Sequence, residues 1–283
     1  MIEQLIRLEQ YNLTNLHGDT IRLDVRYTEN GTKKPIIIIC HSFMAFKNWG
    51  FFPYLAECFV KAGYVSVSFN FSLNGVIADG SRITDFEAFA RNTFSCELKD
   101  LNTVVNACCN GTITGTIGDA ERIGIVGHSR GGGIAIIQTA TDKRIKALTT
   151  LSTISTFDRW REHQKIEWRK HGYLALARDS TISPLRMGIG LLNDFETNSE
   201  RLNILRSASA ITCPWLIVHG KTDVTVQVKE AEALYNASNK TTTQLSLFEH
   251  IGHLYNATSP NEDQYRTLNT IVEPSIQFFK RSL

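Results

Sequence analysis

The sequence predicts an α/β fold in which helices cover both faces of a mainly parallel, doubly wound sheet. Short apolar runs, such as 35–40, 65–70 and 214–219, alternate along the chain with segments of helical periodicity. This alternation is typical of strand–helix–strand units, which build parallel sheets. A length of 283 residues with 42% apolar content allows one α/β domain with an insertion.

The first half of the chain contains an opening hairpin, two further strands and two helices. Residues 2–11 and 20–28 are expected to pair around a turn at His17-Gly18-Asp19, and the β-branched run at 35–40 indicates a strand buried on both faces. A helix should begin near Pro53 and stop at Gly63, before the strand at 65–70. The next helix is predicted by apolar residues at three- and four-residue steps: Phe94, Leu98, Leu101, Val104, Val105 and Cys108.

The second half continues the alternation but interrupts it once. The expected elements are a strand at 123–126, a helix to about 141, strands at 146–151 and 214–219, a helix at 226–237, a strand at 243–248 and a terminal helical region. Between 152 and 209 no strong strand signal occurs. We therefore predict that 1–151 and 210–283 form the core and that 152–209 is an insertion.

The run Gly127-His128-Ser129-Arg130-Gly131 directly follows the apolar residues at 123–126. It matches a nucleophile elbow, in which a strand turns sharply into a helix and exposes a serine hydroxyl above the sheet. Glycines on either side leave room for that turn. A serine between glycines is also found in ordinary turns, but the junction of strand and helix favours Ser129 as a nucleophile. His128, inside the turn, is expected to be structural.

A serine nucleophile needs a base and an orienting carboxylate, and both have candidates at the expected places. Asp223 follows the strand at 214–219, and His253 follows the strand at 243–248. The carboxyl ends of parallel strands meet at one edge of the sheet, so these side chains can converge on Ser129. The alternative for Asp223 is a turn former or helix N-cap. The histidines that compete with His253 are His41, His219 and His250.

Two backbone N–H groups are candidates for binding an oxyanion. The buried strand at 35–40 ends in His41-Ser42-Phe43. The N–H groups of Phe43 and of Arg130, the residue after the proposed nucleophile, would be the two donors.

These motifs resemble the alpha/beta hydrolase superfamily, from the strand before His41 to the C-terminus. The chain is most similar to bacterial serine esterases related to the dienelactone hydrolase and prolyl oligopeptidase branches, although true dienelactone hydrolases have cysteine at the position of Ser129. The segments that carry the resemblance are 41–50, 69–72, 127–133, 219–223 and Gly252-His253. The resemblance implies the alpha/beta hydrolase fold, with a helical cap at 152–209.

The expected reaction is acyl transfer from a carboxylic ester of modest size to water, through an ester on Ser129. Thioesters and amides suit the same chemistry, and the alternatives are a serine peptidase or amidase and a non-catalytic ligand-binding protein of the same fold. Aromatic residues in the insertion are candidates for the substrate pocket: Phe157, Trp160 and Trp168. Alternatively, these rings are ordinary core residues of an amphipathic helix.

Composition argues against several other classes of protein. A net charge of +2 without a basic, aromatic-rich run speaks against nucleic-acid binding. No apolar run approaches the roughly twenty residues of a membrane span, and the N-terminus lacks a signal-peptide core. The six cysteines are expected to be thiols of a cytoplasmic protein, and no spacing predicts a metal site. We expect no cofactor, a small acyl ester as the substrate, and a homodimer as one possible assembly.

Overall fold

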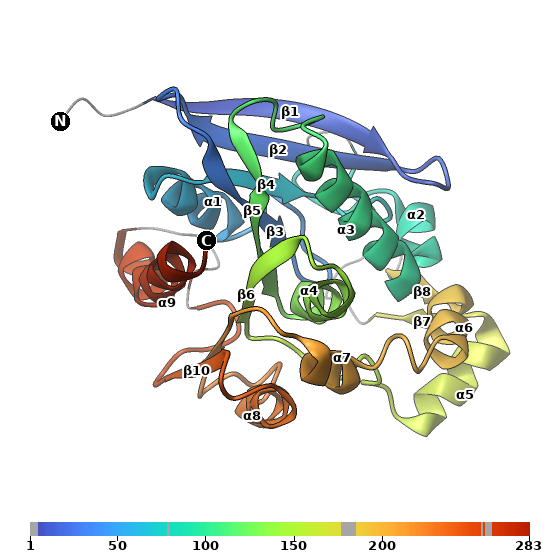
Figure 1. Ribbon diagram of the computed structural model, residues 1–283. Coiled ribbons are helices and arrows are strands. Elements are labelled where there is room, and N and C mark those ends of the chain that lie inside the picture. Colours follow the sequence, from blue (N-terminus) through green and yellow to red (C-terminus); the bar gives the residue numbers. More distant parts are fainter. Residues whose placement is uncertain (1–4, 78–79, 177–184, 256, 258–261) are drawn as a thin grey trace.

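The computed structural model describes residues 5–77, 80–176, 185–255, 257 and 262–283. Its centre is an eight-stranded sheet in the order β1-β2-β4-β3-β5-β6-β9-β10 (Figure 1). The strands of this sheet are β1 (Ile6–Thr14), β2 (Thr20–Thr28), β3 (Lys34–Cys40), β4 (Val65–Phe69), β5 (Gly118–His128), β6 (Ile145–Leu151), β9 (Trp215–Gly220) and β10 (Thr243–Phe248). Strands β1 and β2, and β2 and β4, pair antiparallel, whereas the other neighbours pair parallel. The predicted mainly parallel α/β fold is confirmed.

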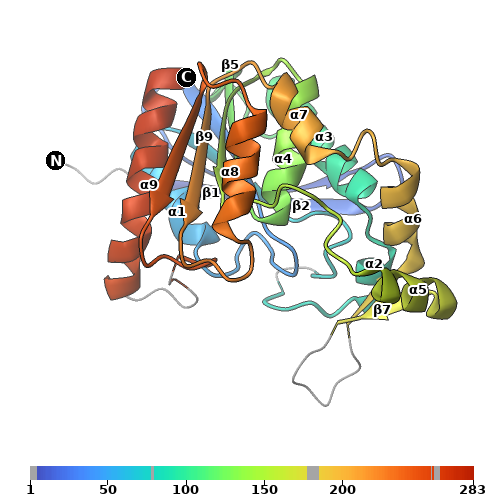
Figure 2. The same ribbon diagram turned by 90° about the horizontal axis from the view of Figure 1, so that it is seen from below.

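Helices cover both faces of this sheet, as Figures 1 and 2 show. One face carries α1 (Phe52–Lys61) and α9 (Glu262–Ser282). The other carries α3 (Phe94–Cys109), α4 (Arg130–Thr141) and α8 (Val228–Ala237), with α7 (Ile204–Ala210) packed on α4. The sheet is therefore doubly wound, as expected from the alternation of strands and helices.

The isoleucine run of β3 shows how the sequence separates the two core layers. Side chains alternate across a strand, so successive isoleucines enter opposite layers. Ile36 and Ile38 join the core beneath α3 and α4, whereas Ile37 and Ile39 join the core beneath α1 and α9. All four are at most 2% exposed, which explains why this strand is continuously apolar.

The opening hairpin differs slightly from its expected bounds. β1 runs from Ile6 to Thr14, where the sequence predicts 2–11, and its first expected residues, 2–4, lie outside the described residues. Nine residue pairs join it to β2. Gly18 lies in the connecting turn with φ +84°, a conformation that favours glycine.

The segment between β6 and β9 contains α5 (Glu162–His171), the two-stranded sheet of β7 (Tyr173–Ala175) and β8 (Arg186–Gly188), α6 (Ile189–Thr197) and α7. Residues 177–184, between the two short strands, lie outside the described residues. α5, β7 and α6 gather at one corner of the molecule (Figure 2). The short helix α2 (Phe86–Arg91) lies against β8. Thus α2, which directly precedes α3 in the chain, packs against a strand of the segment between β6 and β9.

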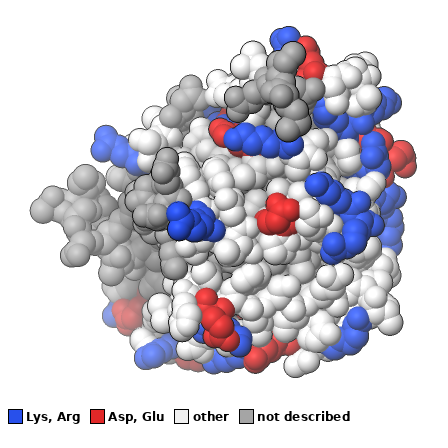
Figure 3. All heavy atoms as spheres, turned by 90° about the vertical axis from the view of Figure 1, so that its left-hand side faces the viewer, with Lys and Arg blue, Asp and Glu red and all other residues white. Residues whose placement is uncertain are grey.

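On the face shown in Figure 3, positive and negative side chains are scattered among uncharged ones. This distribution fits the small net charge of the sequence. Within the described ranges, no helix combines the length and the apolar character needed to cross a bilayer.

Candidate active site

Ser129 sits at a sharp turn between β5 and α4. Its backbone has φ 54° and ψ −119°, a conformation that residues with a side chain rarely adopt. Its own N–H donates to the carbonyl of Leu151 at 2.9 Å, and its carbonyl accepts from the N–H groups of Gly132 and Gly133. These bonds hold the hydroxyl-bearing residue in the expected strand-to-helix elbow.

The glycines of the elbow allow very close packing. A Cβ on Gly127 would lie 2.6 Å from the Cα of Gly132, and a Cβ on Gly131 would lie 2.2 Å from the carbonyl oxygen of His41. Only residues without a side chain allow these approaches. The start of α4 therefore rests directly on the end of β3, where the predicted oxyanion loop begins.

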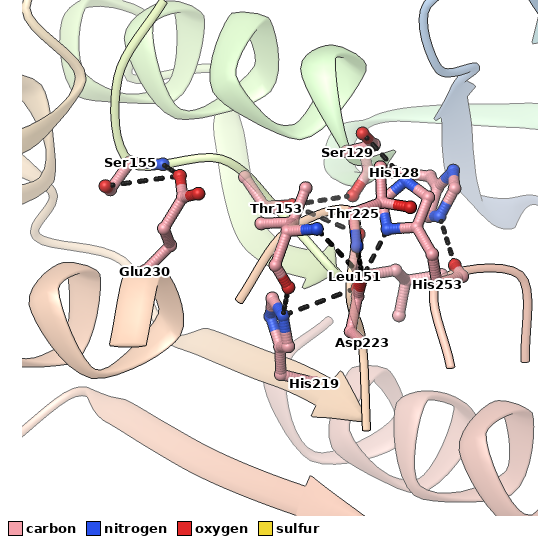
Figure 4. A network of polar contacts seen from close by, with 12 residues as sticks. His128, Ser129, Leu151, Thr153, Ser155, His219, Asp223, Thr225, Glu230 and His253 are labelled. Carbon is pink, nitrogen blue, oxygen red and sulfur yellow. Dashed lines mark hydrogen bonds and ion pairs between the residues drawn. The ribbon is translucent and has the colours of Figure 1, made fainter. Parts of the chain in front are cut away.

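Three side chains from separate loops form one hydrogen-bonded chain (Figure 4). His253 Nε2 lies 3.1 Å from Ser129 Oγ, and His253 Nδ1 lies 2.8 Å from Asp223 Oδ2. Because the carboxylate accepts, Nδ1 carries the proton and Nε2 is free to accept from the serine hydroxyl. The structure thus brings Ser129, His253 and Asp223 together in the order that serine chemistry requires.

Asp223 uses its two oxygens for different tasks. Oδ2 faces His253, while Oδ1 accepts from the backbone N–H groups of Thr225 and Val226 at 2.9 and 2.8 Å. Burial works to raise the pKa of Asp223, but the hydrogen bonds from His253 and Val226 outweigh it, so its pKa lies below the ordinary value. Asp223 is therefore a turn former as well as the partner of His253. It is not the N-cap residue of α8, because Gln227 occupies that position.

His128 lies beneath His253 and fixes its main chain. His128 Nε2 donates to the carbonyl of His253 at 3.0 Å, and the two rings lie 4.9 Å apart. Burial lowers the pKa of His128 to about 3, so the ring stays neutral. His219 supports the acid loop from below, since its Nε2 donates to the carbonyl of Val226 at 2.8 Å. Both histidines position the loops that surround Ser129.

The predicted oxyanion donors lie where β3 and β5 end side by side. His41 Nδ1 donates to the carbonyl of Ser42 at 2.8 Å, and His41 Nε2 accepts from the N–H of Phe71. Ser42 does not have a positive φ, whereas Met44, two residues later, has φ 60°. Within the described part of the chain, no backbone hydrogen bond uses the N–H of Phe43 or Arg130. Both groups are available to a ligand.

A cavity of about 490 Å³ opens beside Ser129 and His253. Its walls are mostly apolar and aromatic, and the charged groups among them are Arg130 and Arg159. The other lining residues are Ser42, Phe43, Met44, Ala45, Trp49, Phe94, Ile154, Phe157, Trp160, Leu176, Met187, Thr225, Val226 and Leu254. Its volume and lining suit a small, largely apolar ligand.

The three aromatic pocket residues suggested by the sequence have different positions. Phe157 and Trp160 line the cavity. Trp168 is fully buried behind Trp160, with the ring centroids 5.0 Å apart, and does not line it.

The buried carboxylate of Glu97 has no counterpart in the sequence-based site. Glu97 is 4% exposed and forms an ion pair with Arg130 at 2.9 Å. A signal for it was present, because position 97 falls on the apolar stripe of the helix that includes Phe94 and Leu101. A carboxylate on such a stripe needs a buried partner.

The fold and the arrangement around Ser129 define the protein as an α/β hydrolase. Residues 87–274, about two thirds of the chain, match the prolyl oligopeptidase family, and the chain belongs to that family. A relative from Escherichia coli, the "Uncharacterized 31.7 kDa protein in traX-finO intergenic region", is 24% identical over 259 residues, covering 81% of this chain and 86% of the relative.

Solved structures of other hydrolases share the fold. The alpha/beta hydrolase GrgF from Penicillium sp. sh18 superposes with a TM-score of 0.71 at 18% identity, covering 98% of this chain and 99% of GrgF. The esterase domain of a Rhodothermus marinus protein gives a TM-score of 0.63 at 17% identity, covering 96% and 99%. At these identities the similarity concerns the fold, and the substrate has to be argued from the site.

Proposed function

We propose that this protein is a serine hydrolase that cleaves a carboxylic ester through a covalent acyl-serine intermediate. The observation that carries the proposal is the hydrogen-bonded chain from Asp223 through His253 to Ser129, at the edge of an apolar cavity. In this proposal Ser129 is the nucleophile, His253 the general base and then acid, and Asp223 the residue that fixes the imidazole tautomer.

Acylation begins when Ser129 Oγ attacks the ester carbonyl carbon and its proton moves to His253 Nε2. The carbonyl oxygen becomes negatively charged and accepts from the N–H groups of Phe43 and Arg130, which are otherwise without backbone acceptors in the described chain. The imidazolium then donates its Nε2 proton to the alkoxide as the C–O bond breaks. The alcohol leaves, and the acyl group stays on Ser129.

Deacylation repeats these steps with water. His253 Nε2 takes a proton from water, whose oxygen attacks the acyl carbon, and the same two N–H groups stabilise the second oxyanion. Collapse of this intermediate returns the proton to Ser129 Oγ and releases a carboxylic acid. Asp223 stays ionised throughout, which agrees with its lowered pKa.

The inserted segment at 152–209 is proposed to be the cap that shapes the substrate pocket. Phe157, Trp160, Leu176 and Met187 of this segment contribute to the cavity wall. Their apolar side chains suit a hydrophobic acyl or alcohol group. Because the insertion supplies much of the wall, its sequence is expected to set the size of the ester that binds.

The charges of the cavity favour an ester over a peptide with a free N-terminus. Among the described lining residues the charged side chains are arginines, and none is a carboxylate that could pair with a substrate ammonium. Both arginines are paired with carboxylates outside the lining, Arg130 with Glu97 and Arg159 with Glu230, so the cavity suits a neutral substrate. Membership of the prolyl oligopeptidase family keeps peptide or amide cleavage as the second candidate.

A substrate panel separates these two activities. We expect p-nitrophenyl esters of short and medium acyl chains to be hydrolysed, with kcat lower by a factor of about 10⁴–10⁶ in Ser129→Ala. Aminoacyl p-nitroanilides should be cleaved poorly. Efficient cleavage of the anilides with little turnover of esters would favour the peptidase, and ester turnover that is unchanged in Ser129→Ala would contradict the proposal.

A further inference from the structure

We propose that the buried ion pair between Glu97 and Arg130 positions the oxyanion hole by holding Phe43 and Arg130 against each other. The inference rests on the proposed function, since an oxyanion hole matters only if acyl transfer takes place at Ser129. Glu97 does not line the cavity. It is therefore assigned as a positioning residue that acts through the Arg130 side chain.

The ion pair fixes the plane of the guanidinium group. Arg130 Nε donates to Glu97 Oε2 at 3.1 Å, and Nη2 lies 2.9 Å from Oε1, without the alignment of a hydrogen bond. Asn92 Nδ2 donates to the same Oε1 at 2.8 Å. Glu97 and Arg130 are 4% and 8% exposed, so neither charge can turn towards bulk water. Two contacts from one carboxylate restrict both the place and the tilt of the guanidinium.

The fixed guanidinium lies between two aromatic rings. Its central carbon is 4.8 Å from the ring centroid of Phe43 and 4.5 Å from that of Phe94. Phe94 is on α3, as Glu97 is, whereas Phe43 belongs to the loop after β3. The guanidinium thus connects that loop to α3 and to the start of α4.

This contact joins the two residues whose backbone N–H groups are the proposed oxyanion donors. One donor belongs to a loop and the other to the first turn of α4, so their separation depends on how the loop is held. A well-packed apolar pair could fill the space at lower desolvation cost. A guanidinium group held in one plane, however, gives the Phe43 ring a flat, charged surface to pack against in a defined orientation.

The central test uses a variant in which both charges are removed together. A single Glu97→Gln change leaves an unpaired buried cation and risks unfolding the protein. The double variant Glu97→Leu/Arg130→Met keeps the backbone N–H of position 130 and leaves no buried charge. We expect a folded protein, by circular dichroism and thermal unfolding, whose kcat on p-nitrophenyl butyrate is about tenfold to a hundredfold lower. KM should change less than kcat.

A boronic acid reports the oxyanion hole separately from ester binding. Phenylboronic acid forms a tetrahedral adduct with an active serine and places an oxygen in the hole. Its inhibition constant should rise in the double variant by a factor similar to the fall in kcat. A merely structural ion pair would leave this constant and kcat unchanged in folded protein.

A second variant tests the aromatic contact itself. Phe43→Leu keeps the donor N–H but removes the ring, and we expect the same changes in kcat and boronate inhibition. Because both changes act on one contact, the triple variant should be little worse than the double variant. Unchanged kcat and boronate inhibition in Phe43→Leu would overturn the proposal even if the double variant does not fold. Where the double variant folds, fully additive effects in the triple variant would overturn it as well.

The matched control is an arginine–carboxylate pair at the opposite end of α4. Arg144 Nη2 lies 2.6 Å from Asp142 Oδ2, and the Arg144 side chain is 41% exposed. Arg144→Met should leave kcat and boronate inhibition unchanged. If Ser129→Ala retains full ester hydrolysis, the proposed function itself fails. If hydrolysis needs Ser129 but the folded double variant matches the wild type, only the positioning role is refuted.

Discussion

Ser129 combines an unfavourable backbone conformation with a favourable place for chemistry. Its φ of 54° is held by hydrogen bonds that join its backbone to Leu151 of β6 and to the first turn of α4, rather than by its own preference. Such conformations cost about 1–3 kcal/mol and persist where the surrounding structure imposes them. The turn points the hydroxyl towards His253, so the conformational cost is linked to the placement of the proposed nucleophile.

Two substitutions at this residue should separate strain from chemistry. Ser129→Ala keeps a Cβ at positive φ, whereas Ser129→Gly removes it. We expect both variants to be inactive, with the free energy of unfolding about 1 kcal/mol higher for Ser129→Gly than for Ser129→Ala. Urea denaturation of the two proteins measures the difference. Equal stability, or greater stability of the alanine variant, would show that the elbow is not strained.

At the scale of single residues, the sequence allowed the prediction of candidate site residues that come shortly after a strand. Ser129 follows one predicted strand, Asp223 and His253 follow two others, and the structure brings these three side chains together. Glu97 could not be paired with Arg130 from the sequence, because their contact depends on how α3 packs against α4. Trp168 was misjudged for the same reason: its spacing does not tell which side of Trp160 it occupies.

At the scale of elements, the site depends on the close approach of α4 to the end of β3. The contact is made by Gly131, whose missing Cβ would lie 2.2 Å from the His41 carbonyl oxygen. That atom belongs to the backbone and cannot rotate away. The approach of this helix therefore sets the distance between the elbow and the proposed oxyanion loop at 41–43.

Gly131→Ala should consequently destabilise the protein and distort the site. We expect a loss of about 3 kcal/mol or more in unfolding free energy, together with a loss of ester hydrolysis. The matched control is Gly190→Ala in α6, where the nearest atom would be a side-chain carbon at 4.0 Å. This variant should be neutral or up to about 1 kcal/mol more stable. Similar stability of the two variants would contradict the proposed role of the close contact.

Some of the helices and strands could be predicted from the sequence and others could not. Strands with a dense apolar run, such as β3 and β9, and helices with a regular apolar stripe, such as α3, were found within a few residues. The helix α2 and the strands β7 and β8 were not. β7 and β8 have three residues each and pair with one another, and α2 has six, so each contains fewer than two periods of its pattern. Their positions depend on tertiary contacts, including that of α2 with β8.

At the scale of the whole molecule, His41 and His128 are buried beneath the loops around Ser129 and stay neutral. Burial lowers the pKa of His41 to about 4 and that of His128 to about 3. Each ring also donates to a backbone carbonyl that shapes a loop. Protonation of either ring would place an uncompensated charge in the core.

The stability of the protein should therefore decrease in mild acid. Between pH 6.5 and about 4, both histidines bind protons in the unfolded chain but not in the folded one, so the folded state loses about 2–3 kcal/mol per pH unit. The contribution of the two neutral histidines to the free energy of unfolding is complete above pH 6.5. It declines as the pH falls towards the pKa values of the folded state. Urea denaturation at pH 7.5, 6.0 and 5.0 measures this slope.

The contribution of one histidine can be isolated by comparing slopes rather than absolute stabilities. His41→Asn removes one titrating group, and its side-chain amide can still donate to the carbonyl of Ser42. The slope over the same range should then decrease by about 1.4 kcal/mol per pH unit. An unchanged slope would mean that His41 does not titrate differently in the folded and unfolded states.

The central claim is that the hydroxyl of Ser129 becomes covalently bonded during turnover. A fluorophosphonate reacts with an activated serine and mimics the first tetrahedral species, so intact-protein mass spectrometry followed by peptide mapping measures the claim directly. We expect one adduct per chain, mapped to Ser129, absent in Ser129→Ala and formed much more slowly in Asp223→Asn. Folded wild-type protein that gains no adduct, or an adduct that persists in Ser129→Ala, would contradict the account.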